Sequence, residues 1–123
     1  MKAALLVFVG GGIGSMLRFL VYKLFSTSAY PVFVNTLIIN IGGSLFLGIL
    51  LGYSLKQGNW GENSLLFLTT GLCGGFTTFS TFAFENQALL RAGDYLSFSL
   101  YTFGSIFLGI LAVFIGMSLS KLV

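Results

Sequence analysis

The sequence predicts an all-α membrane protein with four transmembrane helices, and two observations carry that prediction. Of the 123 residues, 56% are hydrophobic and only 7% are charged, whereas a soluble domain is about 25% charged. Because this number of charges is too small to cover a water-facing surface, the apolar side chains must face lipid. The second observation is spacing: four apolar stretches follow one another, each long enough to cross a hydrocarbon core about 30 Å thick.

The predicted spans use nearly the whole chain. They run from about residue 3 to 24, 32 to 54, 64 to 90 and 96 to 120. The connections are short, so consecutive spans should be antiparallel neighbours with both termini on the same side of the membrane. No length remains for a further folded unit, and residues 1–123 are expected to form a single transmembrane domain.

The basic residues divide evenly between the two expected membrane faces. The face of the termini carries Lys2, Lys56 and Lys121, and the other carries Lys23, Arg91 and, near it, Arg18. An excess of Lys and Arg in cytoplasmic loops normally determines orientation. The even split allows insertion in both orientations and pairing as an antiparallel dimer; the alternative is a weak bias that another feature resolves. The scattered bases form no patch for nucleic acid.

The third span contains a segment that is unusual for a membrane helix. Gly74-Gly75 is followed by Thr77-Thr78, and glycine and threonine are poor helix formers. We expect a break at Gly74-Gly75, which would free backbone groups inside the bilayer, where they must be buried in protein or line a cavity. The alternative is a continuous helix whose glycines only pack. The length of the span, about 40 Å as a straight helix, slightly favours the break.

Few residues could support catalysis. Histidine is absent and the single thiol, Cys73, lies in an apolar stretch. Glu62 and Asp94 fall in connections, and Glu85 is the only carboxylate near the interior of a span. Because no pair of groups suits general acid–base chemistry, we expect no enzyme.

Polar and aromatic residues near the expected break suit a path for a small anion. Asn40 offers two amide N–H donors from span two, and the hydroxyls of Tyr101 and Ser105 add more from span four. Phe79 and Phe82 lie beside the break, and the edge of an aromatic ring carries positive partial charge. Such groups can replace the hydration of a small anion.

At these residues the sequence resembles the Fluc/CrcB family of fluoride channels over essentially the whole chain. The matching motifs are Gly-Gly-Gly-Ile-Gly-Ser-Met-Leu-Arg at 10–18, Asn-Ile-Gly-Gly at 40–43, and the highly specific Gly-Leu-Cys-Gly-Gly-Phe-Thr-Thr-Phe-Ser-Thr-Phe at 71–82. The resemblance implies a passive, fluoride-selective channel that exports cytoplasmic fluoride across the plasma membrane (the bacterial inner membrane) and gives fluoride resistance. It also implies a dual-topology antiparallel homodimer in lipid, with two pores and a central structural sodium ion.

The resemblance further implies roles by position. The pore is matched by Asn40, Phe79, Phe82, Thr36, Ser80, Thr81, Tyr101 and Ser105, the last five forming a polar track. Arg18 matches an arginine near the aqueous vestibule, and Glu85 matches a carboxylate near a pore mouth. Gly74 and Thr77 match the positions whose backbone carbonyls hold the sodium ion. One position departs from the family: Gly109 stands where some relatives carry a serine, so this end of the track lacks a hydroxyl.

Two other functions fit the residues. A small four-span proton-coupled multidrug exporter can also have dual topology, but it needs a carboxylate embedded in the membrane. Span one has none, and Glu85 is expected near a span end. The second is a non-conducting membrane protein whose glycine-rich stripes serve only helix packing.

Overall fold

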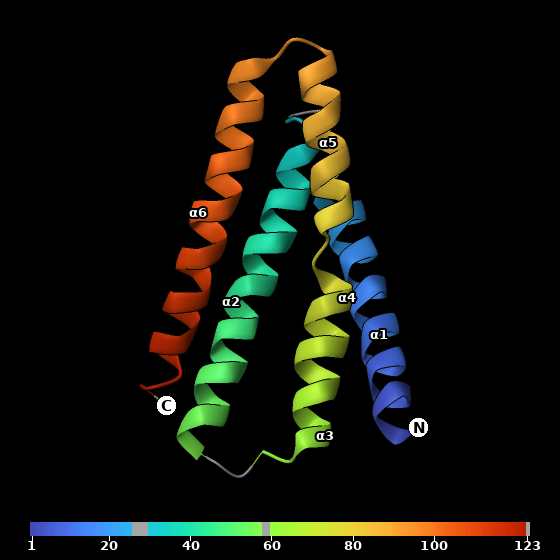
Figure 1. Ribbon diagram of the computed structural model, residues 1–123, viewed down its shortest axis with the longest axis vertical. Coiled ribbons are helices and arrows are strands. Elements are labelled where there is room, and N and C mark those ends of the chain that lie inside the picture. The colour runs from blue at the N-terminus through green and yellow to red at the C-terminus, as the bar shows by residue number, and fades with distance from the viewer. Residues whose placement is uncertain (26–29, 58–59, 123) are drawn as a thin grey trace.

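A computed structural model describes residues 1–25, 30–57 and 60–122 of the chain. The described residues form four spans, which lie side by side as long rods (Figure 1). Three are single helices, α1 (Lys2–Phe25), α2 (Phe33–Gln57) and α6 (Tyr95–Leu119). The third span is segmented into α3 (Glu62–Leu65), the π-helix η1 (Leu66–Cys73), α4 (Gly74–Phe76) and α5 (Phe79–Arg91). All four spans are long and apolar enough to cross a membrane, which confirms the four predicted spans.

Both chain ends lie at the same end of the bundle, as predicted (Figure 1). There the Lys56 ammonium in the last turn of α2 donates a hydrogen bond to the backbone carbonyl of Lys121, at 3.4 Å. At the opposite end α5 turns into α6 through Gly93, whose φ of 74° is a conformation that favours glycine. Asp94 then caps α6 by accepting the backbone N–H of Ser97 at 3.1 Å. Hydrogen bonding to the side chain and then to the backbone of Ser97 lowers the pKa of Asp94.

Glycines hold α1 close to the first half of the third span. A Cβ placed on Gly14 would lie 2.8 Å from the backbone N of Phe76, and one on Gly75 would lie 2.9 Å from the Cα of Gly11. The α2–α6 contact is equally close, since a Cβ on Gly116 would lie 2.8 Å from the backbone N of Ile49. Small residues that let backbones approach are a main source of helix association in lipid. The glycine stripes therefore build two tight helix pairs.

The third span is broken, as predicted, but the predicted position at Gly74-Gly75 is wrong. Gly74 has helical angles (φ −63°, ψ −37°), and the chain becomes extended only at Thr77 (φ −78°, ψ 158°) and Thr78 (φ −148°, ψ 114°). Gly75 is used for the close approach to α1, which requires a helix at that point. Threonine is β-branched and suits extended backbone. The interruption therefore falls where the chain leaves the glycine contact.

Candidate functional site

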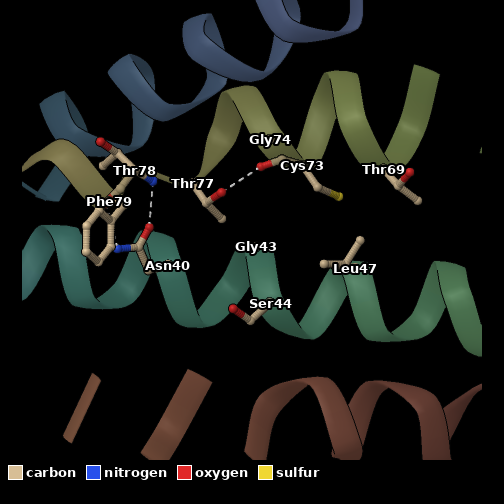
Figure 2. A pocket seen from close by; sticks show the side chains of 10 residues that line it. All are labelled: Asn40, Gly43, Ser44, Leu47, Thr69, Cys73, Gly74, Thr77, Thr78 and Phe79. Carbon is tan, nitrogen blue, oxygen red and sulfur yellow. Dashed lines mark hydrogen bonds between the residues drawn. The ribbon is translucent and has the colours of Figure 1, made fainter. Parts of the chain in front are cut away.

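Asn40 of α2 bonds to the extended residues of the break. Its Nδ2 donates to the backbone carbonyl of Thr78 at 3.1 Å, and the backbone N–H of Thr78 donates to its Oδ1 at 2.8 Å. Figure 2 shows this amide lying directly against Thr78. The side chain thus replaces the helical partners that the break removes, and it keeps a second N–H for another acceptor. The sequence identified Asn40 as a source of N–H donors near the break; the structure shows that one of them bonds to the broken backbone itself.

Polar side chains of α1 bond to carbonyls of the same segment. Arg18 Nη1 donates to the Thr77 carbonyl at 3.2 Å, and Ser15 Oγ donates to the Gly75 carbonyl at 3.4 Å. Arg18 was predicted near the aqueous vestibule; in the structure its guanidinium lines a pocket and bonds to the break. Ser15 was missed, although it lies three residues before Arg18 and hence on the same helix face.

A cluster of hydroxyls marks the start of α5. Thr78 is its N-cap, with Oγ1 accepting the backbone N–H of Thr81 at 3.3 Å and lying 3.0 Å from Thr81 Oγ1 and 3.3 Å from Ser80 Oγ. The first N–H groups of a helix lack intrahelical acceptors and form its positive end. Two predicted track residues, Ser80 and Thr81, therefore meet at a site that favours negative charge. The capping role of the Thr78 side chain was not predicted, although threonine is a preferred N-cap.

Aromatic rings continue from the break toward α6. The ring centroids of Phe79 and Phe82 are 5.7 Å apart, and those of Phe82 and Tyr101 are 5.1 Å apart at 62°. Both separations are in the range of favourable ring pairs. Tyr101 is buried at 2% exposure, whereas Phe79 is 79% exposed. The predicted aromatic residues are thus in contact with one another, and the outermost ring is open to the surroundings.

Glu85 accepts hydrogen bonds from two predicted track residues. Thr36 Oγ1 donates to Oε1 at 2.9 Å, and the Tyr101 hydroxyl donates to Oε2 at 2.7 Å. Glu85 lies toward the Arg91 end of the third span, as the sequence predicts, and it is half-buried. The hydroxyl protons of Thr36 and Tyr101 therefore point to a carboxylate of their own chain.

Ser105 differs from these residues. Its Oγ is buried and has no hydrogen-bond partner in the described part of the chain. A buried polar atom without a partner is costly, so this hydroxyl is suited to bind water or an ion. The predicted departure at Gly109 stands one turn further on, with its would-be Cβ 3.9 Å from Ser44 Oγ.

Cavities with polar walls lie on two sides of the break. One, of about 320 Å³, is lined by Asn40, Gly43, Ser44, Leu47, Thr69, Cys73, Gly74, Thr77, Thr78 and Phe79 (Figure 2). Another, of about 370 Å³, is lined by Ser15, Arg18, Phe19, Tyr22, Thr36, Ile39, Thr78 and Thr81. Thr78 belongs to both walls. The break thus separates two cavities that carry hydrogen-bond donors and one cation.

Comparisons with known proteins show the family to which the chain belongs. Residues 5–117 match the family described as "CrcB-like protein, Camphor Resistance (CrcB)". A protein of Azobacteroides pseudotrichonymphae named "Fluoride-specific ion channel FluC" is 46% identical, over 98% of both chains. A protein of the same name in Phocaeicola vulgatus is 44% identical, over 98% of this chain and 100% of the relative. Another in Ignicoccus hospitalis is 39% identical, over 98% of this chain and 97% of the relative. The chain therefore belongs to the CrcB family.

Proposed function

We propose that the chain is a passive fluoride-selective channel that carries the anion out of the cytoplasm across the plasma membrane. Family membership, with relatives that are named ion channels, confirms that the chain is not an enzyme. The observation that carries the proposal is the break at Thr77–Thr78, with donor-lined cavities on either side of it. The printed names of the full-length relatives support fluoride as the ion.

The chemistry around the break suits a small, strongly hydrated anion. The free N–H of Asn40, the hydroxyls near the start of α5 and the Ser105 hydroxyl can each replace one water of hydration. The ring edges of Phe79 and Phe82 add positive partial charge without a hydrogen-bond donor. A narrow path of this kind favours fluoride over chloride, because the larger anion cannot approach all donors together.

The working unit in this proposal is an antiparallel homodimer with two pores. Gly74, Phe79 and Ser80 are exposed beside the break, and a Cβ on Gly74 would meet no atom closer than 3.9 Å. Irregular backbone and hydroxyls at this depth need to be covered by protein or to line water. A second copy in the inverted orientation would cover them, and the even distribution of basic residues supports insertion in both orientations.

The residues at the break also fit the sodium ion that the family resemblance implies. The N–H of Thr78, which an uninterrupted helix would direct to the Gly74 carbonyl, donates to Asn40 instead. The Thr77 carbonyl accepts from Arg18 and has a second lone pair. Broken membrane helices offer such carbonyl oxygens to cations. A sodium ion held by Gly74 and Thr77 of both copies would offset the partial negative charge of these carbonyls.

The sodium site predicts a cation requirement. When sodium is replaced throughout by N-methyl-D-glucamine, we expect the dimer to lose thermal stability and fluoride flux to fall, because the facing carbonyls then repel one another. Melting temperature in detergent and efflux from liposomes measure the two effects. Equal values in both salts would contradict a structural sodium ion.

Fluoride flux tests the proposed function directly. The purified protein is reconstituted in liposomes loaded with potassium fluoride or potassium chloride, and efflux is followed with ion-selective electrodes after adding valinomycin. We expect rapid fluoride efflux and little chloride efflux. Fluoride efflux no faster than from empty liposomes, or equal efflux of both anions, would overturn the proposal.

The pore rings give a further prediction. Phe79→Ile and Phe82→Ile should each lower fluoride efflux by about tenfold or more while the protein still assembles, because an aliphatic group lacks the positive ring edge. The exposed Phe103→Ile on the outer face of α6 is the matched control and should conduct like the wild type. Wild-type rates in both pore variants would mean that these rings only fill space.

The rival function as a proton-coupled exporter depends on Glu85, which is half-buried and bonded to two hydroxyls. Such an exporter would drive proton movement when a gradient of a cationic drug is applied. A pH-sensitive dye inside the same liposomes distinguishes the two functions. The channel proposal predicts no drug-driven change in internal pH.

A further inference from the structure

We propose that Asn86 and Thr102 form a latch between α5 and α6 that positions Phe82 in the ion path. Both are positioning residues in this proposal, since they act through Phe82 and contact no ion. The inference rests on the proposed function and deepens it. It gives a role in permeation to two residues that are not among the predicted pore residues.

The latch consists of two hydrogen bonds to one carboxamide. Asn86 Nδ2 donates to the backbone carbonyl of Phe82 at 2.9 Å, and Asn86 Oδ1 accepts from Thr102 Oγ1 at 2.7 Å. Asn86 is buried, with 7% exposure. A buried amide between two apolar helices needs both bonds, so the pair joins the backbone of Phe82 to α6.

The latch stands next to the aromatic contact of the pore. Thr102 directly follows Tyr101, whose ring meets that of Phe82 at 5.1 Å and whose hydroxyl bonds to Glu85. Positions 82, 85 and 86 share one face of α5, because helix neighbours on a face are three and four residues apart. Phe82 is therefore held by its ring and by its own carbonyl, and both contacts lead to adjacent residues of α6.

The break leaves the rotation of α5 to its contacts with α2 and α6, among them the bonds of Glu85 and the latch. Thr77 and Thr78 are extended, so the preceding helix does not determine how α5 is rotated about its axis. In lipid, apolar contacts between helices bring no hydrophobic gain over lipid contacts, and interhelical hydrogen bonds contribute to choosing one arrangement. The Asn86–Thr102 bond can therefore select the rotation of α5 that directs Phe82, and with it Phe79, toward the path.

A pairwise replacement separates positioning from stability. Thr102→Val removes the hydroxyl at nearly constant shape and leaves Asn86 Oδ1 unpaired. The double variant Asn86→Leu/Thr102→Val removes both partners, which is nearly neutral for stability because no buried polar atom is left alone. Thr102→Ser keeps the donor. Ser120→Ala is the control, since that hydroxyl is buried and bonds to the Met117 carbonyl at the end of α6, far from the latch in sequence.

Each protein is reconstituted and assayed for fluoride efflux, the fluoride-to-chloride efflux ratio and melting temperature. We expect Thr102→Val to lower fluoride efflux at least fivefold, and Thr102→Ser and Ser120→Ala to retain wild-type efflux. The double variant should melt close to the wild type but keep the fivefold loss, with a lower fluoride-to-chloride ratio.

A double variant with wild-type efflux and ratio would overturn the latch, because the pair would then act only on stability. That result decides the question even if Thr102→Val alone fails to fold. Wild-type protein without fluoride efflux would overturn the channel proposal and the latch together, and so is distinguishable from failure of the latch alone.

Discussion

Replacing Gly14 with alanine should destabilise the folded protein by about 3 kcal/mol, the upper part of the range for overpacked cores. The added methyl group would lie 2.8 Å from the backbone N of Phe76 and 3.1 Å from the carbonyl carbon of Gly75, well inside the contact distance of about 3.5 Å. These are backbone atoms of α4, so relief requires moving the segment that leads into the break. Thermal unfolding and the monodisperse fraction in detergent measure the loss.

Gly12→Ala is the matched control for this prediction. Gly12 lies in the same helix, and a Cβ built on it meets no atom within 4 Å. Alanine is the better helix former by about 1 kcal/mol, so this variant should melt at or above the wild-type temperature. Equal destabilisation by both substitutions would show that α1 rejects any added methyl group and would contradict a specific contact at Gly14.

The spans were predictable because they depend on local properties. Apolar run length and polar connections are readable in one dimension, and the helices end within three residues of the predicted limits. The position of the break was less accessible. Gly74-Gly75 and Thr77-Thr78 are both weak helix formers, and what distinguishes them in the structure is that Gly75 packs closely against Gly11. That contact is between segments far apart in sequence.

In the candidate site too, residue types could be predicted from the sequence, whereas contacts between distant segments could not. Asn40, Phe79 and Phe82 were identifiable by residue type and by the family motifs, and their roles in permeation stay predictions. Their partners depend on how each helix is rotated, which periodicity does not specify when every face is apolar. The pairing of Arg18 with the Thr77 carbonyl is of this kind. So is the bonding of Glu85 to hydroxyls of two other helices, which its position near the span end does not reveal.

Asn40→Leu should abolish most fluoride efflux and lower stability together. The substitution removes both bonds to Thr78 and leaves its N–H and C=O without partners in the membrane. Each unsatisfied buried group costs about 1–3 kcal/mol, so the break should lose its present geometry. We expect efflux to fall by about tenfold or more, since 1.4 kcal/mol already corresponds to a factor of ten. Liposome efflux and melting temperature measure both effects, and Asn63→Leu in exposed α3 is the control.

Asn40→Asp separates the two tasks of this side chain. Aspartate can still accept the Thr78 N–H, so it should melt above Asn40→Leu, but it offers the anion no amide donor and brings a negative charge to the path. If the amide contacts the permeating ion, efflux through Asn40→Asp should be as low as through Asn40→Leu despite the better stability. Wild-type efflux through Asn40→Asp would mean that Asn40 only stabilises the broken helix and does not contact the permeating ion. The donors that select the anion would then have to be the hydroxyls at the start of α5, which bond one another, and that of Ser105, which has no partner among the described residues.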